Sequence, residues 1–289
     1  MISRDVRLLL PYVAVGRVRA LKVVTAPWLH EFRDRRLERV ACSMSQFVLA
    51  TNSAILHDLG RRGISKTRSF VTGNPVPRER VEFGRTCRKT DARRRLGLDL
   101  TRPIIAYTGK LYLGMRELDY LLSAASRLPE CLFLFTGGQP PVIERLREQL
   151  RERSMDNVQF AGLLDDPEET RFYQQAADVL VSYYSTEDHA YAHHNLPNKL
   201  AEYMTTGNPI VAADFPATRD VLNRENAVLV RPDDVDALIE ALAFAVGSPD
   251  KTAPLAARAQ RDIAARTTES VGADLSDFLG QVWRVHNGP

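Results

Sequence analysis

Polar side chains recur on one face of a predicted helix that begins near residue 195. Asn195, Asn198 and Glu202 are spaced i, i+3 and i+7, so they form one polar stripe running from the helix N-terminus. A plain interpretation makes Glu202 a solvated charge on an amphipathic helix, which is the usual fate of such a residue. Two features favour a binding site instead: an apolar strand follows the helix, and helix N-termini attract anions. The stripe is our first candidate site.

A second candidate site follows a predicted strand and leads into a helix, in the run YTGKLYLGMRE. In doubly wound folds ligands bind at that edge of the sheet, where helix N-termini and loop N–H groups favour anions. Gly109 lets the backbone approach a ligand closely, and Lys110 and Arg116 offer two cations to a diphosphate. The spacing alone is a weak pattern, and the alternative is two surface cations on a loop.

The helix that carries the stripe is expected to pack on a sheet. Its apolar residues recur at helical spacing: Leu196, Leu200, Tyr203 and Met204. Pro197 suits a first helical turn, and Gly207 followed by Pro209 ends the helix. Residues 210–213 then read as a short strand that is buried on both faces.

Strands alternate with helices from Thr90 onward, which predicts a parallel, doubly wound α/β sheet. The expected strands are 103–108, 131–136, 157–160, 178–183, 210–213 and 227–230. The expected helices between and after them are 91–96, 117–127, 141–152, 167–176, 235–246 and 253–279. Before Thr90 we expect helices at 5–15 and 31–41, strands at 20–25, 46–51 and 68–72, and a helix through residue 59 that Asn52 caps.

Composition is that of a soluble globular protein, with 289 residues, 44% hydrophobic and 26% charged. No apolar run reaches membrane-spanning length and the first residues do not read as a signal peptide, so we expect a cytoplasmic protein. The three cysteines are far apart and suggest neither disulfides nor a zinc site.

Charge is unevenly divided along the chain. Residues 1–95 hold 21 Lys and Arg against 8 Asp and Glu, and the remainder holds 18 against 28. The densest cations are Arg17, Arg19, Lys22, Arg33, Arg35, Arg36 and Arg39. Such a segment suits an anionic partner, and we expect peripheral contact with anionic lipid headgroups. Nucleic acid is not favoured, because we find no stacking aromatic residues and no known module.

The run NLPNKLAEYMTTGNPIVAAD, from Asn195 to Asp214, resembles the signature region of retaining GT-B glycosyltransferases of the bacterial family 4 type, where a run like SPLKLFEYMAAGRPIVASD recurs. The matching residues are Pro197, Lys199, Glu202, Tyr203, Met204, Gly207, Pro209, Ile210, Val211, Ala212 and Asp214. The family includes exopolysaccharide and lipopolysaccharide enzymes. The resemblance implies a GT-B-like α/β fold, with a complete C-terminal doubly wound Rossmann-like domain and a partial N-terminal α/β domain, and a nucleotide-sugar donor.

The resemblance also implies roles for individual residues. Glu202 would bind the ribose hydroxyls of the donor, and Lys110 and Arg116 would bind its diphosphate. His194 stands where many members have a sugar-contacting glutamate. The other residues that it assigns to donor binding are Gly109, Gly138, Gly162, Leu163, Asn195 and Lys199. His30, which is assisted by Arg33, would face the sugar from the acceptor side.

A metal site is the alternative interpretation of the histidine-rich loop before the signature. His189, His193 and His194 lie beside Glu187 and Asp188. We expect no metal, because the loop shows no recognised ligand spacing and the family needs no metal for donor binding. The favoured interpretation is a loop over the sugar, with His194 or Asn195 touching it.

We therefore predict a glycosyltransferase that moves a sugar from a nucleotide-diphosphate donor to a sugar or lipid-linked acceptor, without a further cofactor. The alternative is a non-catalytic nucleotide-sugar-binding subunit that needs a partner chain. The predicted domains are a partial N-terminal acceptor-side domain (1–72), a donor-binding domain (73–246) and C-terminal helices (247–289). Strands at 20–25 and 46–51 would lack neighbours, so we expect a partner or a second copy to cover residues 1–72.

Overall fold

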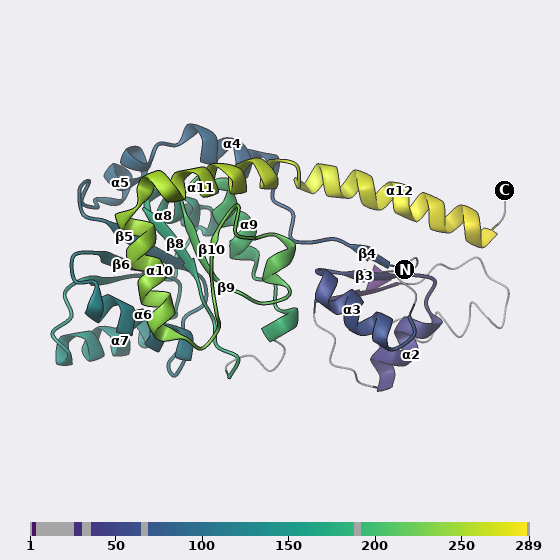
Figure 1. The fold of residues 1–289 in the computed structure, drawn as a ribbon, viewed down its shortest axis with the longest axis horizontal. Coiled ribbons are helices and arrows are strands. Elements are labelled where there is room, and N and C mark those ends of the chain that lie inside the picture. Colours follow the sequence, from purple (N-terminus) through teal and green to yellow (C-terminus); the bar gives the residue numbers. More distant parts are fainter. Residues whose placement is uncertain (1, 4–25, 31–35, 65–68, 188–191, 288–289) are drawn as a thin grey trace. The chain divides into compact units, whose positions relative to one another are not determined.

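The protein forms two compact units (Figure 1). The computed structural model describes residues 2–3, 26–30, 36–64, 69–187 and 192–287. The first unit is built from Met1–Pro75, His193–Leu196 and Arg266–Pro289, and the second from Val76–Ala192 and Pro197–Ala265. The predicted domain boundaries stay predictions.

The second unit is a parallel sheet of six strands in the order β7-β6-β5-β8-β9-β10. The strands are β5 (Ile104–Thr108), β6 (Leu132–Thr136), β7 (Val158–Gly162), β8 (Val179–Ser182), β9 (Ile210–Ala213) and β10 (Val228–Val230). From β5, strands β6 and β7 follow to one side, and β8, β9 and β10 follow to the other side. The sheet is therefore doubly wound as predicted, and its strand order reverses between β5 and β8.

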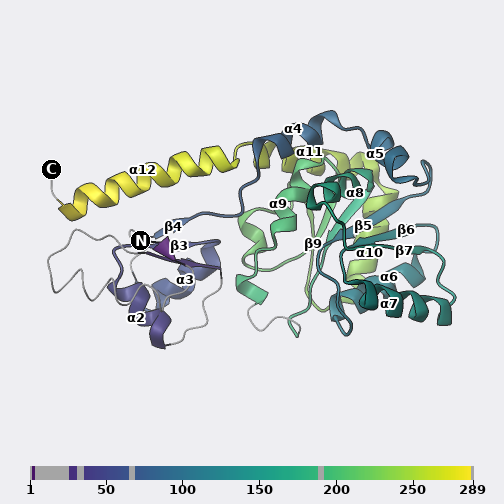
Figure 2. The same cartoon turned by 180° about the vertical axis from the view of Figure 1, so that it is seen from behind.

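Helices cover both faces of this sheet (Figures 1 and 2). On one face lie α6 (Arg116–Arg127), α7 (Pro140–Glu152) and α10 (Val235–Gly247). On the other lie α8 (Thr170–Ala176) and α9 (Asn198–Thr205), with α4 (Arg78–Thr86), α5 (Lys89–Leu96) and α11 (Pro249–Ala264) packed outside them. Every residue of β5, β6, β8 and β9 is buried, which explains why these strands are almost wholly apolar.

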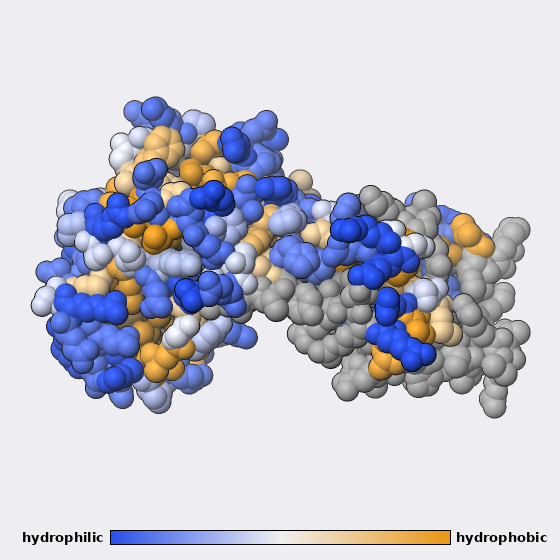
Figure 3. Space-filling view, turned by 60° about the horizontal axis from the view of Figure 1, so that its bottom comes forward, coloured by the Kyte–Doolittle hydropathy of each residue, from blue (hydrophilic) through white to orange (hydrophobic). Residues whose placement is uncertain are grey.

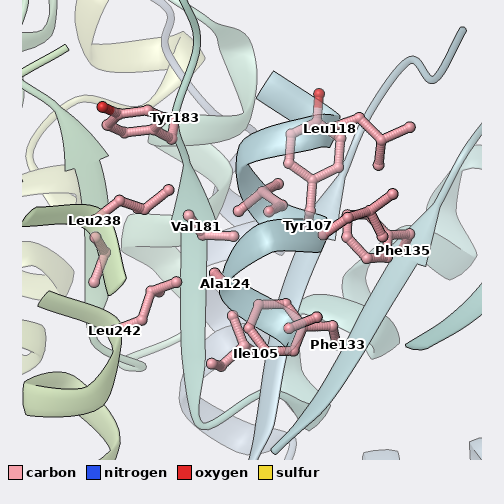
Figure 4. Close-up of a cluster of buried hydrophobic side chains, with 14 of the residues drawn as sticks. Ile105, Tyr107, Leu118, Ala124, Phe133, Phe135, Val181, Tyr183, Leu238 and Leu242 are labelled. Carbon is pink, nitrogen blue, oxygen red and sulfur yellow. The ribbon is translucent and has the colours of Figure 1, made fainter. Parts of the chain in front are cut away.

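The main core lies between the sheet and the α6–α10 layer (Figure 4). Strand residues and helix residues interdigitate there; among them are Ile105, Phe133, Phe135, Val181, Leu118, Ala124, Leu238 and Leu242. Tyr107 belongs to the same cluster and is the next-to-last residue of β5. The core therefore reaches the edge of the sheet at which the loops after the strands begin.

The first unit contains a second parallel sheet in the order β1-β2-β3-β4. Its strands are β1 (Ile2–Ser3), β2 (Ala26–Leu29), β3 (Val48–Ala50) and β4 (Ser69–Val71), and its helices are α2 (Arg36–Met44), α3 (Ser53–Arg61) and α12 (Thr268–Asn287). Asn52 caps α3 as predicted, because its side-chain oxygen accepts from the Ile55 N–H. Phe278 of α12 packs on Phe47 and Phe70 and closes one side of this sheet.

Several expectations about the first unit need correction. The strand expected at 20–25 and the helix at 5–15 lie outside the described residues. The strand expected at 46–51 does not lack neighbours, because β3 pairs with β2 on one side and β4 on the other. The open-edge argument for a covering partner is therefore wrong for this strand.

Two helices also differ from the prediction. The single helix expected at 253–279 is two helices, since Thr267 accepts from the Ser270 N–H and begins α12 anew. Helix α4 was not predicted at all, because its residues are mostly charged and Pro77 at its start offers no side-chain cap.

No helix in the described parts of the chain has the length and apolar character needed to span a bilayer. The face of the second unit seen in Figure 3 is mostly hydrophilic, with hydrophobic residues scattered over it.

Candidate functional site

The ends of three neighbouring strands are tied together by backbone hydrogen bonds at the C-terminal edge of the second unit's sheet. The Gly109 N–H donates to the Thr136 carbonyl over 3.3 Å, and the Gly137 N–H donates to the Gly162 carbonyl over 2.7 Å. Gly137 has φ +100°, and a Cβ there would lie 1.8 Å from the Gly109 carbonyl oxygen. Only glycine permits this approach, so the loops after β5, β6 and β7 form one rigid rim.

Lys199 of α9 lies against this rim. Its Nζ is 3.6 Å from the centroid of the Tyr107 ring, and a Cβ added to Gly109 would meet it at 2.8 Å. Burial lowers the pKa of Lys199 to about 8, and the carboxylates of Glu117 and Glu202 oppose that shift. The structure thus places a desolvated cation directly beside the loop that was predicted to bind phosphate.

Glu117 balances that cation from the first turn of α6. The Tyr107 hydroxyl donates to its carboxylate, and both residues are buried. Burial, helped by the negative charge of Glu117, raises the pKa of Tyr107 well above its ordinary value, so the tyrosine stays a neutral donor. An acid at the first turn of a helix is also stabilised by the helix dipole.

Glu202 lies on α9 with its carboxylate held on one side and open on the other. Gln174 of α8 donates to Oε2 over 2.8 Å, and Arg80 Nη2 of α4 lies 3.7 Å from the same oxygen. Gln174 also donates to Thr108 at the end of β5 and accepts from Arg80, so the three side chains form one network. The Glu202 side chain remains 36% exposed, which leaves a carboxylate oxygen able to accept from a ligand.

Lys110 and Arg116 flank the rim on its exposed side. Lys110 directly follows Gly109 and is exposed, while Arg116 begins α6. Arg116 Nη2 lies 2.6 Å from Glu187, in an ion pair whose members are both half exposed. A surface pair of this kind is worth little, about 0 to 1 kcal/mol, so an anionic ligand can displace Glu187 at small cost.

The other residues assigned to donor binding fall into two groups. Gly138 follows β6 and Gly162 is the last residue of β7, both with positive φ, and Leu163 is exposed beside them at the same edge. His30, His194 and Asn195 belong to the first unit. The buried His194 ring bonds to Asp58 there, so its side chain is engaged within that unit, and exposed His30 directly follows β2. Asn195 precedes α9 and is not part of its helical stripe.

Sequence reasoning missed three members of this site: Arg80, Glu117 and Gln174. Arg80 sits on the unpredicted helix α4, and burial lowers its pKa although Glu202 and Glu168 act the other way. Gln174 is fully buried on α8, and nothing in the run TRFYQQA distinguishes it from its neighbour Gln175. Glu117 lay in the run already singled out, but its burial could not be read from spacing.

Comparison with known protein families shows to which class of enzyme the chain belongs. The family described as Glycosyl transferases group 1 matches residues 102–247, half of the chain and most of the second unit. The chain belongs to this family. The non-catalytic binding subunit is accordingly not favoured, and glycosyl transfer is the activity class of this glycosyltransferase. No curated protein sequence matches the chain.

Solved structures share the fold of this glycosyltransferase over nearly its whole length. The Anabaena protein HepE in complex with UDP is 16% identical, with a TM-score of 0.77 over 97% of this chain and 78% of that chain. Sucrose-phosphate synthase from Thermosynechococcus elongatus is 19% identical (TM-score 0.74; 95% and 71% covered). The lipopolysaccharide outer core galactosyltransferase WaaB is 18% identical (TM-score 0.75; 97% and 74%). The predicted GT-B fold is thereby confirmed.

The buried charge of Lys199 predicts a pH-dependent stability. Its pKa is about 8 in the folded protein against 10.5 for a free lysine, so the unfolded chain binds more protons between these values. The free energy of unfolding should therefore gain about 1 to 2 kcal/mol from this group as pH rises from about 8 to about 10.5. Lys199→Met should remove that gain in urea denaturation curves. Lys251→Met, which removes an exposed lysine of the same unit, is the control, and equal behaviour of the two variants would contradict burial of the Lys199 charge.

Proposed function

We propose that this glycosyltransferase binds a nucleotide-diphosphate sugar at the C-terminal edge of the second unit's sheet. The observation that supports this most directly is that two charged side chains of α9 meet the end of β5. Glu202 is linked to Thr108 through Gln174, and Lys199 lies beside Gly109. This is also the point at which the strand order reverses, where ligands of doubly wound folds bind.

Glu202 is proposed to accept hydrogen bonds from the ribose hydroxyls. The Gln174 amide and the Arg80 guanidinium hold the carboxylate from the protein side, so its orientation is fixed before a ligand arrives. An ionised carboxylate accepts only, and two neighbouring hydroxyl groups suit its two oxygens. Pre-orientation of this kind saves the cost of ordering a charged side chain on binding.

Lys110 and Arg116 are proposed to stabilise the departing diphosphate. Negative charge grows on that group as the sugar leaves, and cations fixed at the strand end lower the barrier at that moment. The absence of a side chain at Gly109 lets Lys199 Nζ lie against the loop, and Arg116 exchanges Glu187 for the ligand. Lys199 supplies a third cation beneath the rim.

The finer assignment is a family 4 enzyme that transfers with retention, which rests on the resemblance of the run from Asn195 to Asp214. The donor base is proposed from a structural relative. HepE has been crystallised with UDP and with UDP-glucose, so a uridine nucleotide is the first donor to test. His30 is proposed to act from the acceptor side.

Peripheral attachment to anionic lipid is proposed for the first unit. Helix α2 exposes Leu37 and Val40 one turn apart, with exposed Arg36 and Arg39 beside them. An apolar pair flanked by cations is typical of helices that lie in the interface of an anionic bilayer. The remaining cations of the predicted basic segment, residues 17 to 35, lie outside the described residues.

Glu202→Gln should weaken UDP binding by about 1 to 3 kcal/mol, because a charged acceptor is replaced by a neutral one. Isothermal calorimetry on the folded variant measures the loss. Glu168→Gln is the matched control, since Glu168 also faces Arg80, at 4.0 Å, but is exposed and has no proposed ligand contact. Unchanged affinity for Glu202→Gln would return Glu202 to the role of a solvated charge.

Replacing Lys110 and Arg116 together by alanine should lower the affinity for UDP at least about tenfold and leave the affinity for uridine unchanged, because both cations are proposed to touch phosphate alone. Glu187→Gln controls for loss of the ion pair, since it releases Arg116 without removing the cation. An equal loss for UDP and uridine would refute the assignment.

Leu37→Ser combined with Val40→Ser should reduce co-sedimentation with phosphatidylserine-containing vesicles about tenfold, because two apolar side chains no longer enter the bilayer. Val285→Ser removes another exposed apolar residue, on α12, and should leave binding unchanged. Equal binding by all three proteins, or no binding by the unmodified one, would show that α2 is not a membrane contact.

A further inference from the structure

We propose that the first unit contains a site for a divalent transition-metal ion such as Zn²⁺, formed by Asp58, His193 and His194. All three residues belong to the first unit. Their ligand atoms lie within 4.8 Å of one another. The sequence-based argument against a metal was that the histidine-rich loop shows no recognised ligand spacing. Asp58, on a helix far away in the sequence, supplies a ligand that the loop itself does not contain.

The distances between the ligand atoms suit a tetrahedral ion. Asp58 Oδ2 lies 3.0 Å from His194 Nε2 and 3.6 Å from His193 Nε2. Ligands bonded to zinc at about 2.0 to 2.2 Å stand about 3.3 to 3.6 Å apart at the corners of a tetrahedron. The two separations from Asp58 bracket that range, and all three ligand atoms lie within 4.8 Å of one another.

The buried ligand is held in place before any ion binds. The side-chain amide of Asn52 donates to the His194 carbonyl over 2.8 Å, while its oxygen caps α3, the helix that carries Asp58. One buried side chain therefore fixes both the turn that bears His194 and the helix that bears Asp58. The His194 side chain is 1% exposed and the His193 side chain is 47% exposed. The side chain that moves when an ion binds is therefore His193, at the surface.

The ligand set indicates the class of ion. Two imidazole nitrogens and one carboxylate oxygen suit zinc and its neighbours, whereas magnesium and calcium prefer oxygen ligands. Three protein ligands leave a fourth position for water, as in zinc sites that remain open. Binding requires the proton that His194 Nε2 shares with Asp58 to leave that nitrogen, so protons compete with the metal.

A hydrogen-bonded His–Asp pair without a metal is the competing interpretation, and the two differ in their dependence on His193. The pair needs only His194 and Asp58, and His193 contributes a longer, surface contact to it. A metal site needs His193 as a third ligand. The exposed His193 can also be replaced without disturbing the core.

The test measures Zn²⁺ binding to the untagged full chain by competition with a chromophoric chelator, and Co²⁺ binding by visible absorption. We expect one bound ion per chain, a tetrahedral Co²⁺ spectrum, no competition by Mg²⁺, and affinity that falls as pH is lowered from about 8 to about 6. His193→Gln and Asp58→Asn should each weaken Zn²⁺ binding about 100-fold or more, because a direct ligand is lost.

His57→Gln is the matched control, because it removes an exposed histidine adjacent to Asp58 on α3 and should keep full affinity. Circular dichroism and thermal melting of His193→Gln establish that the variant is folded. The proposal is overturned if the unmodified chain binds no Zn²⁺ at micromolar concentration, or if His193→Gln binds as well as His57→Gln. A cobalt–thiolate band that survives His193→Gln would overturn it too, since it would assign the ion to a cysteine.

Discussion

A parallel sheet that is covered by helices on both faces has nowhere to place polar chemistry except at the ends of its strands. Every residue of β5, β6, β8 and β9 is buried, so a charge within those strands would be desolvated without compensation. Ionisable groups therefore collect at the C-terminal edge, where loop N–H groups and helix N-termini also point. The location of the candidate site follows from this constraint before any residue in it is considered.

The charges at that edge are arranged so that each buried one has a partner. Lys199 lies near Glu117 and Glu202, and Glu202 lies near Arg80. Removing one member would leave another uncompensated, which is far costlier than the pair itself is worth. Burial and pairing together hold Lys199, Arg80 and the Glu202 carboxylate in fixed positions. A donor bound as proposed would meet groups that are already oriented, so less ordering would accompany its binding.

Much of the second unit could be predicted from the sequence, because its signals are local. Buried strands are short apolar runs, and glycines such as Gly109 mark the loops that follow them. Arg80 and Gln174 could not be predicted, because their roles depend on contacts between residues that are distant in the chain. Arg80 bonds to Gln174, which lies 94 positions later, and Gln174 bonds to Glu202, which lies 28 positions later. Helix α4 was missed because charged residues dominate it, and tertiary packing against α9 stabilises it instead of an amphipathic pattern.

The signature run itself shows why helical spacing assigned Asn195 to the wrong element. Asn195 and Leu196 belong to the first unit, where Asn74 donates to the Leu196 carbonyl, and α9 begins only after Pro197. The residue before a proline is disfavoured in the helical region, so the helix cannot extend backward through Leu196. A pattern of i, i+3 and i+7 assumes that the helix is continuous. Here the proline interrupts it, and the residues before that point are held by side-chain amides of the first unit, Asn52 and Asn74, that are distant in the sequence. The signature run is thus divided between the two units. Glu202 lies in the second unit, whereas Asn195 and the two histidines directly before it lie in the first.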